Sequence, residues 1–207
     1  MALICRIIIR LLLLCLALLM VVDLTAQAAR GDTLAQARSR GFLRCGVSEG
    51  FAGFSVRDAT GHWSGMDVDF CRALAAAVLH DSNKVVFVPL KASARFAALQ
   101  MGAVDLLARN TTWTLLREGA LQLQFAGVLF YDAQALMVRT QGGKRSIASL
   151  KGETVCVQKD TSTEDHLRAY SQANSLDLKP LVMDSAIELS RAFFAGRCSA
   201  YTADSSI

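Results

Sequence analysis

The sequence contains no run of basic residues and no stripe of aromatic side chains interleaved with basic ones, although its formal net charge is +4. Proteins that bind nucleic acid usually show such patterns, so we expect no nucleic-acid partner. The three histidines, His62, His80 and His166, are scattered along the chain. No nucleophile, base and orienting group come together, and nothing singles out Glu49 or Glu164 for acid–base chemistry. We therefore expect no catalytic centre, no metal site and no cofactor.

The longest apolar run, residues 11–22, is too short for a membrane span, which needs about 20 apolar residues, and Asp23 ends it. Residues 1–10 carry two arginines and no acid, and Ala26-Gln27-Ala28 fits a small-x-small cleavage site. This three-part pattern predicts a secretory signal peptide over residues 1–28 and an exported protein. A lipoprotein anchor at Cys15 is the alternative, although no small residue precedes that cysteine.

Four of the six cysteines follow the predicted signal peptide: Cys45, Cys71, Cys156 and Cys198. An even number in an exported chain indicates disulfides, and four cysteines allow three connectivities. Two lie in each half of the chain, which favours the pairs Cys45–Cys71 and Cys156–Cys198. Each bond would contribute about 3–4 kcal/mol in the chain-entropy model. Four buried free thiols remain the alternative.

Segments of strand character alternate with segments of helical character along the chain. The strand candidates are FLRCGVS, VVFVPL, VDLLA, TVCVQ, LKPLVM and SAYTA, and the helical ones are residues 33–40, 66–79, 164–173 and 186–195. We predict a further helix that begins at Ser93 and ends at Gly102. This order favours an α/β fold with parallel sheets covered by helices.

The helical periodicity also predicts which side chains are buried. In the helix over residues 66–79 we expect Phe70, Leu74 and Val78 to share one buried face with Cys71. In the helix capped by Ser93, we expect residues 96 and 99, a phenylalanine and a leucine, to face the core.

The two halves of the chain repeat the same order of elements. Asn110 follows Gly102 by as many residues as Asp204 follows Gly196, so both polar residues are expected just past the ends of equivalent strands. Ligands bind at that edge of open parallel sheets. Between the halves, GVLFYDAQALMVR predicts an extended strand that crosses from one lobe to the other. The expected lobes are residues 29–132 and 133–207, the second one incomplete.

The polar residues that follow the strands suit a ligand with both charges. The planar guanidinium of Arg117 matches a carboxylate, and Asn110 and Thr112 can face the same side. TSTE at Thr161–Glu164 predicts a capping box, whose helix start attracts anions. Asp204 would provide the partner for an ammonium group. The alternative is that Thr112 or Thr114 only caps a helix and that Arg117 is a surface charge.

Several longer stretches resemble the periplasmic amino-acid-binding proteins of ABC importers, and in particular the general L-amino-acid binders. They are LRCGVSEGFAGFS, the run from Asp58 to Cys71, RNTTWT, FAGV with FYDAQ, VCVQ with TSTE, and GRCSAYTAD. The resemblance implies a two-lobed type II clamshell, a free L-amino acid as ligand, a membrane permease as partner, and a monomer.

The resemblance also implies a role for individual residues. Arg117, helped by Thr161 and Ser162, would bind the α-carboxylate, and Asp204, helped by Asn110 and Thr112, the α-ammonium. Phe51 would pack against the ligand side chain. Ser48 stands where binders of basic amino acids carry an acid, and Ala92 leaves room where some relatives place an aromatic residue, so the resemblance implies broad specificity.

Two departures from the family pattern matter. Asp160 stands where relatives have glycine, beside the expected carboxylate seat. The chain also stops at Ile207, earlier than family members do, which predicts a C-terminally truncated copy. A non-functional remnant, an exported dehydratase acting on cyclic amino acids and a receptor sensor domain are the alternative functions, although the last would need a later transmembrane segment.

Overall fold

The computed structural model describes residues 32–143 and 146–207. The predicted signal peptide therefore lies outside the described residues. The chain divides into two units, residues 1–42 and 43–207. Within the described ranges, no helix is long and apolar enough to cross a membrane.

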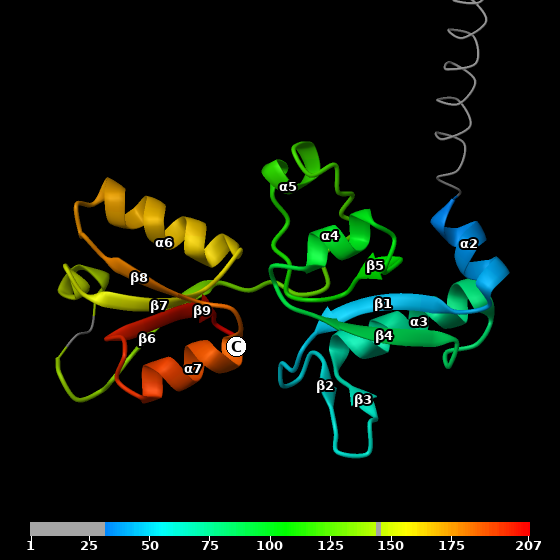
Figure 1. Cartoon of the computed structure of the whole chain (residues 1–207), viewed down its shortest axis with the longest axis horizontal. Helices are drawn as coiled ribbons and strands as arrows, with labels where there is room; N and C mark the ends of the chain where they lie inside the picture. The colour runs from blue at the N-terminus through cyan, green and yellow to red at the C-terminus, as the bar shows by residue number, and fades with distance from the viewer. Residues whose placement is uncertain (1–31, 144–145) are drawn as a thin grey trace, which may run out of the picture. The chain divides into compact units, whose positions relative to one another are not determined.

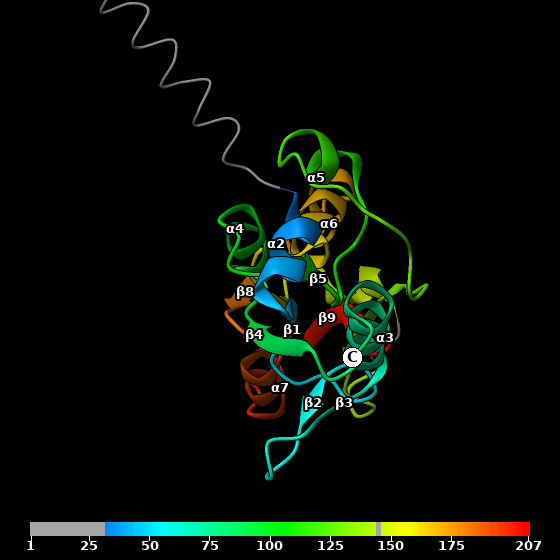
Figure 2. The same ribbon diagram turned by 90° about the vertical axis from the view of Figure 1, so that its right-hand side faces the viewer.

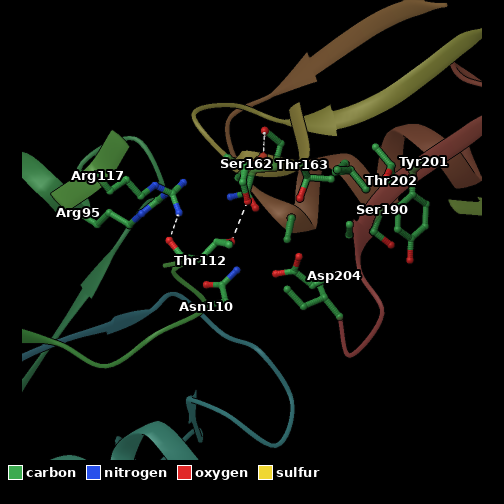
Figure 3. Close-up of a pocket in the computed structure, with 16 residues that line it drawn as sticks. Arg95, Asn110, Thr112, Arg117, Ser162, Thr163, Ser190, Tyr201, Thr202 and Asp204 are labelled. Carbon is green, nitrogen blue, oxygen red and sulfur yellow. Dashed lines mark hydrogen bonds between the residues drawn. The ribbon is translucent and has the colours of Figure 1, made fainter. Parts of the chain in front are cut away.

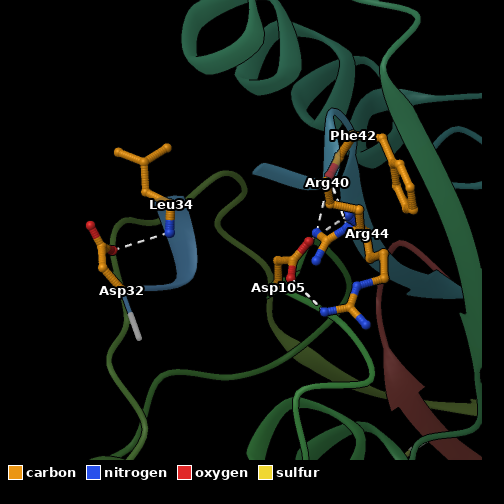
Figure 4. A network of polar contacts seen from close by, with 6 residues as sticks. All are labelled: Asp32, Leu34, Arg40, Phe42, Arg44 and Asp105. Atoms are coloured by element: carbon orange, nitrogen blue, oxygen red, sulfur yellow. Dashed lines mark hydrogen bonds and ion pairs between the residues drawn. The ribbon is translucent and has the colours of Figure 1, made fainter. Parts of the chain in front are cut away.

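The described part of the first unit is a single short helix, α2 (Thr33–Arg40). The side chain of Asp32 caps it by accepting a hydrogen bond from the backbone N–H of Leu34 (Figure 4). The helix ends at Gly41, which adopts φ 83°, a conformation that glycine reaches without steric cost. The Arg40 guanidinium donates to the carbonyl oxygen of Phe42 and lies over its ring.

The second unit begins with a three-stranded parallel sheet in the order β4-β1-β5. Its strands are β1 (Leu43–Ser48), β4 (Val85–Leu90) and β5 (Leu106–Leu107), and a small hairpin pairs β2 (Val56–Arg57) with β3 (Trp63–Ser64). The helices of this part are α3 (Met66–Leu79), α4 (Arg95–Gln100) and α5 (Leu115–Gly119). An ion pair of 2.9 Å between Arg44 in β1 and Asp105 secures the turn into β5 (Figure 4).

A four-stranded sheet follows in the order β6-β9-β7-β8. Its strands are β6 (Gln134–Val138), β7 (Thr154–Gln158), β8 (Lys179–Met183) and β9 (Ala200–Asp204), and only β6 runs antiparallel. The helices are the 3-10 turn η1 (Ile147–Leu150), α6 (Ser162–Ala173) and α7 (Ala186–Phe194). The orders β4-β1-β5 and β8-β7-β9 match, so the repeat expected from the sequence is present in the sheet topology.

Helices α6 and α7 cover opposite faces of the four-stranded sheet (Figures 1 and 2). Alternate residues of β7 point to opposite faces because a strand has a period of two. Val155 and Val157 pack in one core with Leu167 of α6, and Cys156 packs in the other with Leu189 of α7.

One disulfide reinforces each sheet. Cys45 of β1 is bonded to Cys71 of α3, and Cys156 of β7 is bonded to Cys198, just before β9. All four cysteines are buried. The bonds hold a helix or a neighbouring strand against the central strand of each sheet.

Three expectations about the helices of the first sheet were wrong. In α3 the buried residues are Asp67, Val68, Cys71 and Ala75, whereas Phe70 is 36% exposed and residues 74 and 78 are only partly buried. The bond from Cys71 to β1 turns that face inward, which rotates Phe70 outward. Helix α4 begins after Ala94 without a side-chain cap, so Ser93 does not cap it. Its buried residues are an arginine and an alanine, Arg95 and Ala98, and its phenylalanine and leucine are only partly buried.

Three further expectations were only partly met: two predicted strands are shorter, and one predicted capping box lacks a hydrogen bond. The strand predicted over VDLLA is reduced to Leu106–Leu107. Of the extended segment at residues 127–139, only Gln134–Val138 is a strand, because only these residues pair with β9. Glu164 accepts a hydrogen bond from the backbone N–H of Asp160 and not from that of Thr161, so TSTE is a capped helix start without the reciprocal bond of a capping box.

Candidate ligand-binding site

A pocket of about 120 Å³ lies in the second unit, lined on one side by α4, α5 and the segment after β5, and on the other by β9 and the starts of α6 and α7 (Figure 3). Pockets for drug-sized ligands usually measure about 300–1,000 Å³, so this one suits a smaller molecule. Its lining includes six residues singled out from the sequence: Asn110, Thr112, Arg117, Thr161, Ser162 and Asp204. Ser48 and Phe51, which the family resemblance also assigned to the ligand, are not part of this lining.

Two buried arginines form one side of the pocket. Arg117 is 8% exposed, and its Nη1 donates to the carbonyl oxygen of Thr112 at 2.6 Å. Arg95 is 2% exposed, and its Nη2 donates to the carbonyl oxygen of Asp160 at 3.0 Å. Both guanidinium groups lie over the ring of Phe96, at 5.2 and 4.3 Å from its centroid. Neither forms an ion pair with any of the described residues.

The environment disfavours the charge of both arginines. Burial, with nearby Arg109 and Arg117, lowers the pKa of Arg95 to about 9. Burial also lowers the pKa of Arg117, an effect opposed by Asp165 and Asp204. Both side chains remain cationic at neutral pH. Buried charges are tolerated when they meet a partner, so this side of the pocket is suited to an anionic group.

Asp204 ends β9 and is the acid of the pocket. Burial and the nearby carboxylate of Asp132 raise the pKa of Asp204, and the positive charges of Arg117 and Arg95 oppose this increase. Figure 3 shows its carboxylate facing the pocket, across from the two arginines. The pocket therefore has cations on one side and an anion on the other.

The start of α6 contributes neutral polar groups. Thr161 is the N-cap: its hydroxyl accepts from the N–H of Glu164 and donates to the carbonyl oxygen of Gln158. That hydroxyl is thus engaged in capping, and the first N–H groups of the helix provide the positive dipole end. The Ser162 hydroxyl lies 2.8 Å from that of Thr112 and links α6 to the segment after β5.

Ser48 and Phe51 have local structural roles. Ser48 is 1% exposed and donates from Oγ to Oδ1 of Asn110 at 3.1 Å, so it contacts a pocket residue from behind. Phe51 forms an isolated bridge with Ser55. Thr114 is the N-cap of the short helix that contains Arg117, so one part of the capping alternative is correct.

Asp160 adopts φ 57°, the left-handed region that glycine reaches without cost and that aspartate tolerates better than most residues. The position where the family pattern has glycine thus has a backbone geometry that glycine adopts readily. Asp160 is exposed, and its carbonyl oxygen is the group that accepts from Arg95.

Several residues of the pocket were not predicted from the sequence: Arg95, Gln158, Thr163, Ser190, Tyr201 and Thr202. Arg95 lies with Ala98 on the buried face of α4, a position that only the structure reveals. Such a buried arginine requires a specific environment. Across residues 32–143 and 146–207, no group of three or more histidine, cysteine, aspartate or glutamate side chains could hold a metal ion.

The family of this chain is given by comparison with known proteins. The model of the bacterial extracellular solute-binding proteins, family 3, matches residues 43–184. The chain belongs to this family. Its solved members share the type II periplasmic-binding-protein fold, which confirms the predicted fold class and the resemblance on which it rested.

Several relatives align with most of the length of this chain. The general L-amino acid-binding periplasmic protein AapJ of Rhizobium johnstonii is 45% identical over 87% of this chain and 53% of its own length. The glutamate/glutamine/aspartate/asparagine-binding protein BztA of Rhodobacter capsulatus is 44% identical over 88% of this chain and 54% of its own length. A periplasmic binding protein of Brucella ovis with glutathione bound has a TM-score of 0.79 at 45% identity, covering 84% of this chain and 55% of that one. The chain spans about half the length of these relatives.

Proposed function

We propose that this chain binds a free L-amino acid in the pocket described above and delivers it, as a periplasmic monomer, to the permease of an ABC importer. The two sheets with their helices would form the two lobes of the binding protein. Arg117 would bind the α-carboxylate together with the start of α6, and Asp204 would bind the α-ammonium group.

The observation that carries this proposal is the pair of buried guanidinium groups opposite Asp204, neither of which has an ion-pair partner in the described part of the chain. An α-amino acid carries a carboxylate and an ammonium group, both bonded to its Cα. Both groups need partners of opposite charge once they leave water. Arg117 alone suffices for the α-carboxylate. The second cation, Arg95, favours acidic side chains or their amides over basic ones, which agrees with the ligands named for the relative BztA.

The test is calorimetric titration of the purified protein with L-glutamate, L-glutamine, L-alanine and L-lysine. Arg117→Ala and Asp204→Ala should each weaken binding by about 100-fold, because each leaves one charge of the ligand buried without its partner. Arg197→Ala, which removes an exposed arginine outside the pocket, is the matched control and should bind as the parent protein does. An Arg117→Ala protein that folds and binds with unchanged affinity would rule out the assigned clamp.

The alternative of an exported dehydratase is tested by the same protein preparation. One neighbour of this fold, 26% identical with a TM-score of 0.73, is an ancestral amino acid-binding protein named as a precursor of cyclohexadienyl dehydratase. Incubation with cyclic amino-acid derivatives, followed by product analysis, should show no turnover. Release of water from such a substrate, abolished by Asp204→Ala, would favour the enzyme instead.

A further inference from the structure

Two further buried charged residues, Arg109 and Asp67, lie outside the lining of the pocket. Arg109 follows β5, is 9% exposed, and donates from Nη1 to the carbonyl oxygen of Leu90 at 2.6 Å. Its Nη2 donates to Oδ1 of Asn110 at 3.2 Å. Its Nε has no hydrogen-bond partner among the described residues. Arg109 does not line the pocket, so the proposed clamp leaves its charge unexplained.

Asp67 provides the main opposing charge. It lies in the first turn of α3, is 3% exposed, and its Oδ2 has no hydrogen-bond partner in the described part of the chain. Burial raises the pKa of Asp67 to about 6, and the positive charge of Arg109 opposes this increase. Burial lowers the pKa of Arg109 to about 10, and Asp67, followed by Glu49, opposes that decrease. Each charge therefore makes the burial of the other less costly.

The contact between Arg109 and Asn110 determines how the Asn110 amide is oriented. The oxygen and nitrogen of an asparagine amide are often hard to distinguish, and the hydrogen-bond partners must decide. A guanidinium group has donors only, so the atom that faces Arg109 must be the oxygen. Ser48 donates to the same oxygen at 3.1 Å. Both known contacts of Oδ1 thus hold it away from the ligand, and Figure 3 shows Nδ2 on the side of Asp204.

We propose that Arg109 is a positioning residue that fixes the Asn110 amide with its N–H donors toward the pocket. Asn110 then offers the ligand two donors and no acceptor. It cannot accept a hydrogen bond from the α-ammonium group, contrary to the role that the family resemblance implied for it. Because Arg117 and α6 already provide for the α-carboxylate, these donors select a side chain that ends in a carboxylate or carboxamide oxygen. This inference rests on the proposed amino-acid binding.

The first test compares three probes, L-glutamate, L-glutamine and L-norvaline, by calorimetry on the parent protein and on Asn110→Asp. Norvaline matches glutamate in chain length but lacks the terminal oxygens. In Asn110→Asp one carboxylate oxygen still accepts from Arg109 and Ser48, and the other presents an acceptor where the donors were. We expect glutamate and glutamine to lose about 30-fold in affinity relative to norvaline. Equal or tighter binding of all three probes would mean that Asn110 accepts from the ammonium group, and would overturn the proposal.

The second test addresses Arg109 itself. Arg109→Met removes both hydrogen bonds but fills a similar volume, so the Asn110 amide becomes free to rotate. We expect the preference for glutamine over norvaline to fall by about tenfold. Arg109→Lys, which keeps the charge opposite Asp67 but lacks the forked geometry, should restore only part of the preference. A loss of affinity shared equally by all probes would show a purely structural role and contradict the proposal.

A measurement that needs no Arg109 variant covers the case in which Arg109→Met is unstable. The side-chain NH₂ resonances of Asn110 can be assigned in the parent protein by their absence in Asn110→Asp. We expect these resonances to shift on addition of glutamine and not of norvaline. Resonances that respond equally to both probes would overturn the proposal, and a parent protein that binds none of the probes would refute the proposed function and this inference with it. Binding of all three probes without any preference in the parent protein would refute this inference alone.

Discussion

Asp67 is an acid that the fold removes from water without giving its Oδ2 a hydrogen-bond partner in the described residues. Its pKa rises from an ordinary 3.8 to about 6, so the folded protein binds a proton at Asp67 more tightly than the unfolded chain does. The contribution of Asp67 to the free energy of unfolding is therefore fully present below about pH 4 and is lost as the pH rises through about 6. One pH unit corresponds to about 1.4 kcal/mol per proton, so the loss amounts to about 3 kcal/mol.

Asp67→Asn should remove this pH dependence. The free energy of unfolding, measured with urea between pH 4 and 7, should fall with pH in the parent protein by up to about 3 kcal/mol more than in the variant. Asp69→Asn, which changes an exposed acid of the same helix, is the matched control and should follow the parent curve. Parallel curves for the parent and Asp67→Asn would contradict the buried, ionisable state of Asp67.

The charged residues of the site differ in how far the sequence predicted them. Asp204 could be identified because it stands at the end of a strand and the two halves of the chain repeat, and Arg117 because its guanidinium suits a carboxylate. Arg95 and Arg109 were missed because their importance depends on burial, which the local sequence does not reveal: one lies on a helix face and the other directly after β5. The orientation of the Asn110 amide depends on Arg109 and on Ser48. Because Ser48 lies in β1, far from Asn110 in the sequence, the stretch RNTTWT does not reveal this contact.

At the scale of elements, strands with a sheet neighbour on each side were predicted well. TVCVQ is β7 at the residues expected, because Val155 and Val157 on one face and Cys156 on the other give it two apolar faces. The strand VDLLA was overestimated, since its apolar residues pack into the core while only Leu106–Leu107 pair with β1. Apolar character predicts burial more reliably than it predicts hydrogen-bonded pairing.

The disulfide between Cys156 and Cys198 ties the central strand β7 to the start of β9, and thus to Asp204 at the end of that strand. It closes a loop with a sequence separation of 42, which in the chain-entropy model corresponds to about 4 kcal/mol. The double variant Cys156→Ala/Cys198→Ala should lose about that much free energy of unfolding in urea.

The other disulfide provides the comparison for this prediction. Cys45→Ala/Cys71→Ala opens a loop with a separation of 26, and should lose slightly less, about 3.5 kcal/mol. The two losses should be additive in a variant lacking all four cysteines, because the bonds lie in different sheets. An unchanged midpoint in either double variant would mean that the corresponding cysteines are not bonded in the protein.

At the scale of the whole second unit, two side-chain contacts connect α4 and the segment after β5 to the start of α6. These are the hydroxyl pair of Thr112 and Ser162, 2.8 Å apart, and the hydrogen bond of 3.0 Å from Arg95 to the carbonyl oxygen of Asp160. Both lie at the pocket. A ligand held by Arg117 on one side and Asp204 on the other would add a third connection at the same place. We therefore expect ligand binding to be coupled to the cooperative unfolding of the unit.

This coupling has a measurable consequence in thermal unfolding. At a free ligand concentration about 100 times Kd, binding to the folded state alone adds about 2.7 kcal/mol of stability. For a chain of this size that corresponds to a rise in Tm of about 5–10 °C. We expect L-glutamate to shift one cooperative transition by that amount, and to shift it by only about 1–2 °C in Arg117→Ala, where the same concentration is close to the weakened Kd.

The shape of the transition separates the ways in which this expectation can fail. If the segments on the two sides of the pocket unfolded independently, two transitions would be seen even with glutamate present. A ligand that bridges both segments should instead stabilise them together and raise a single transition. A single transition unmoved by any amino acid would mean that the unit folds without a working clamp. In that case Asp160, which the family resemblance places beside the expected α-carboxylate site, is the residue to replace first. Asp160→Asn keeps a side chain that tolerates positive φ while it removes the repulsion, so recovery of the glutamate shift in that variant would identify the defect.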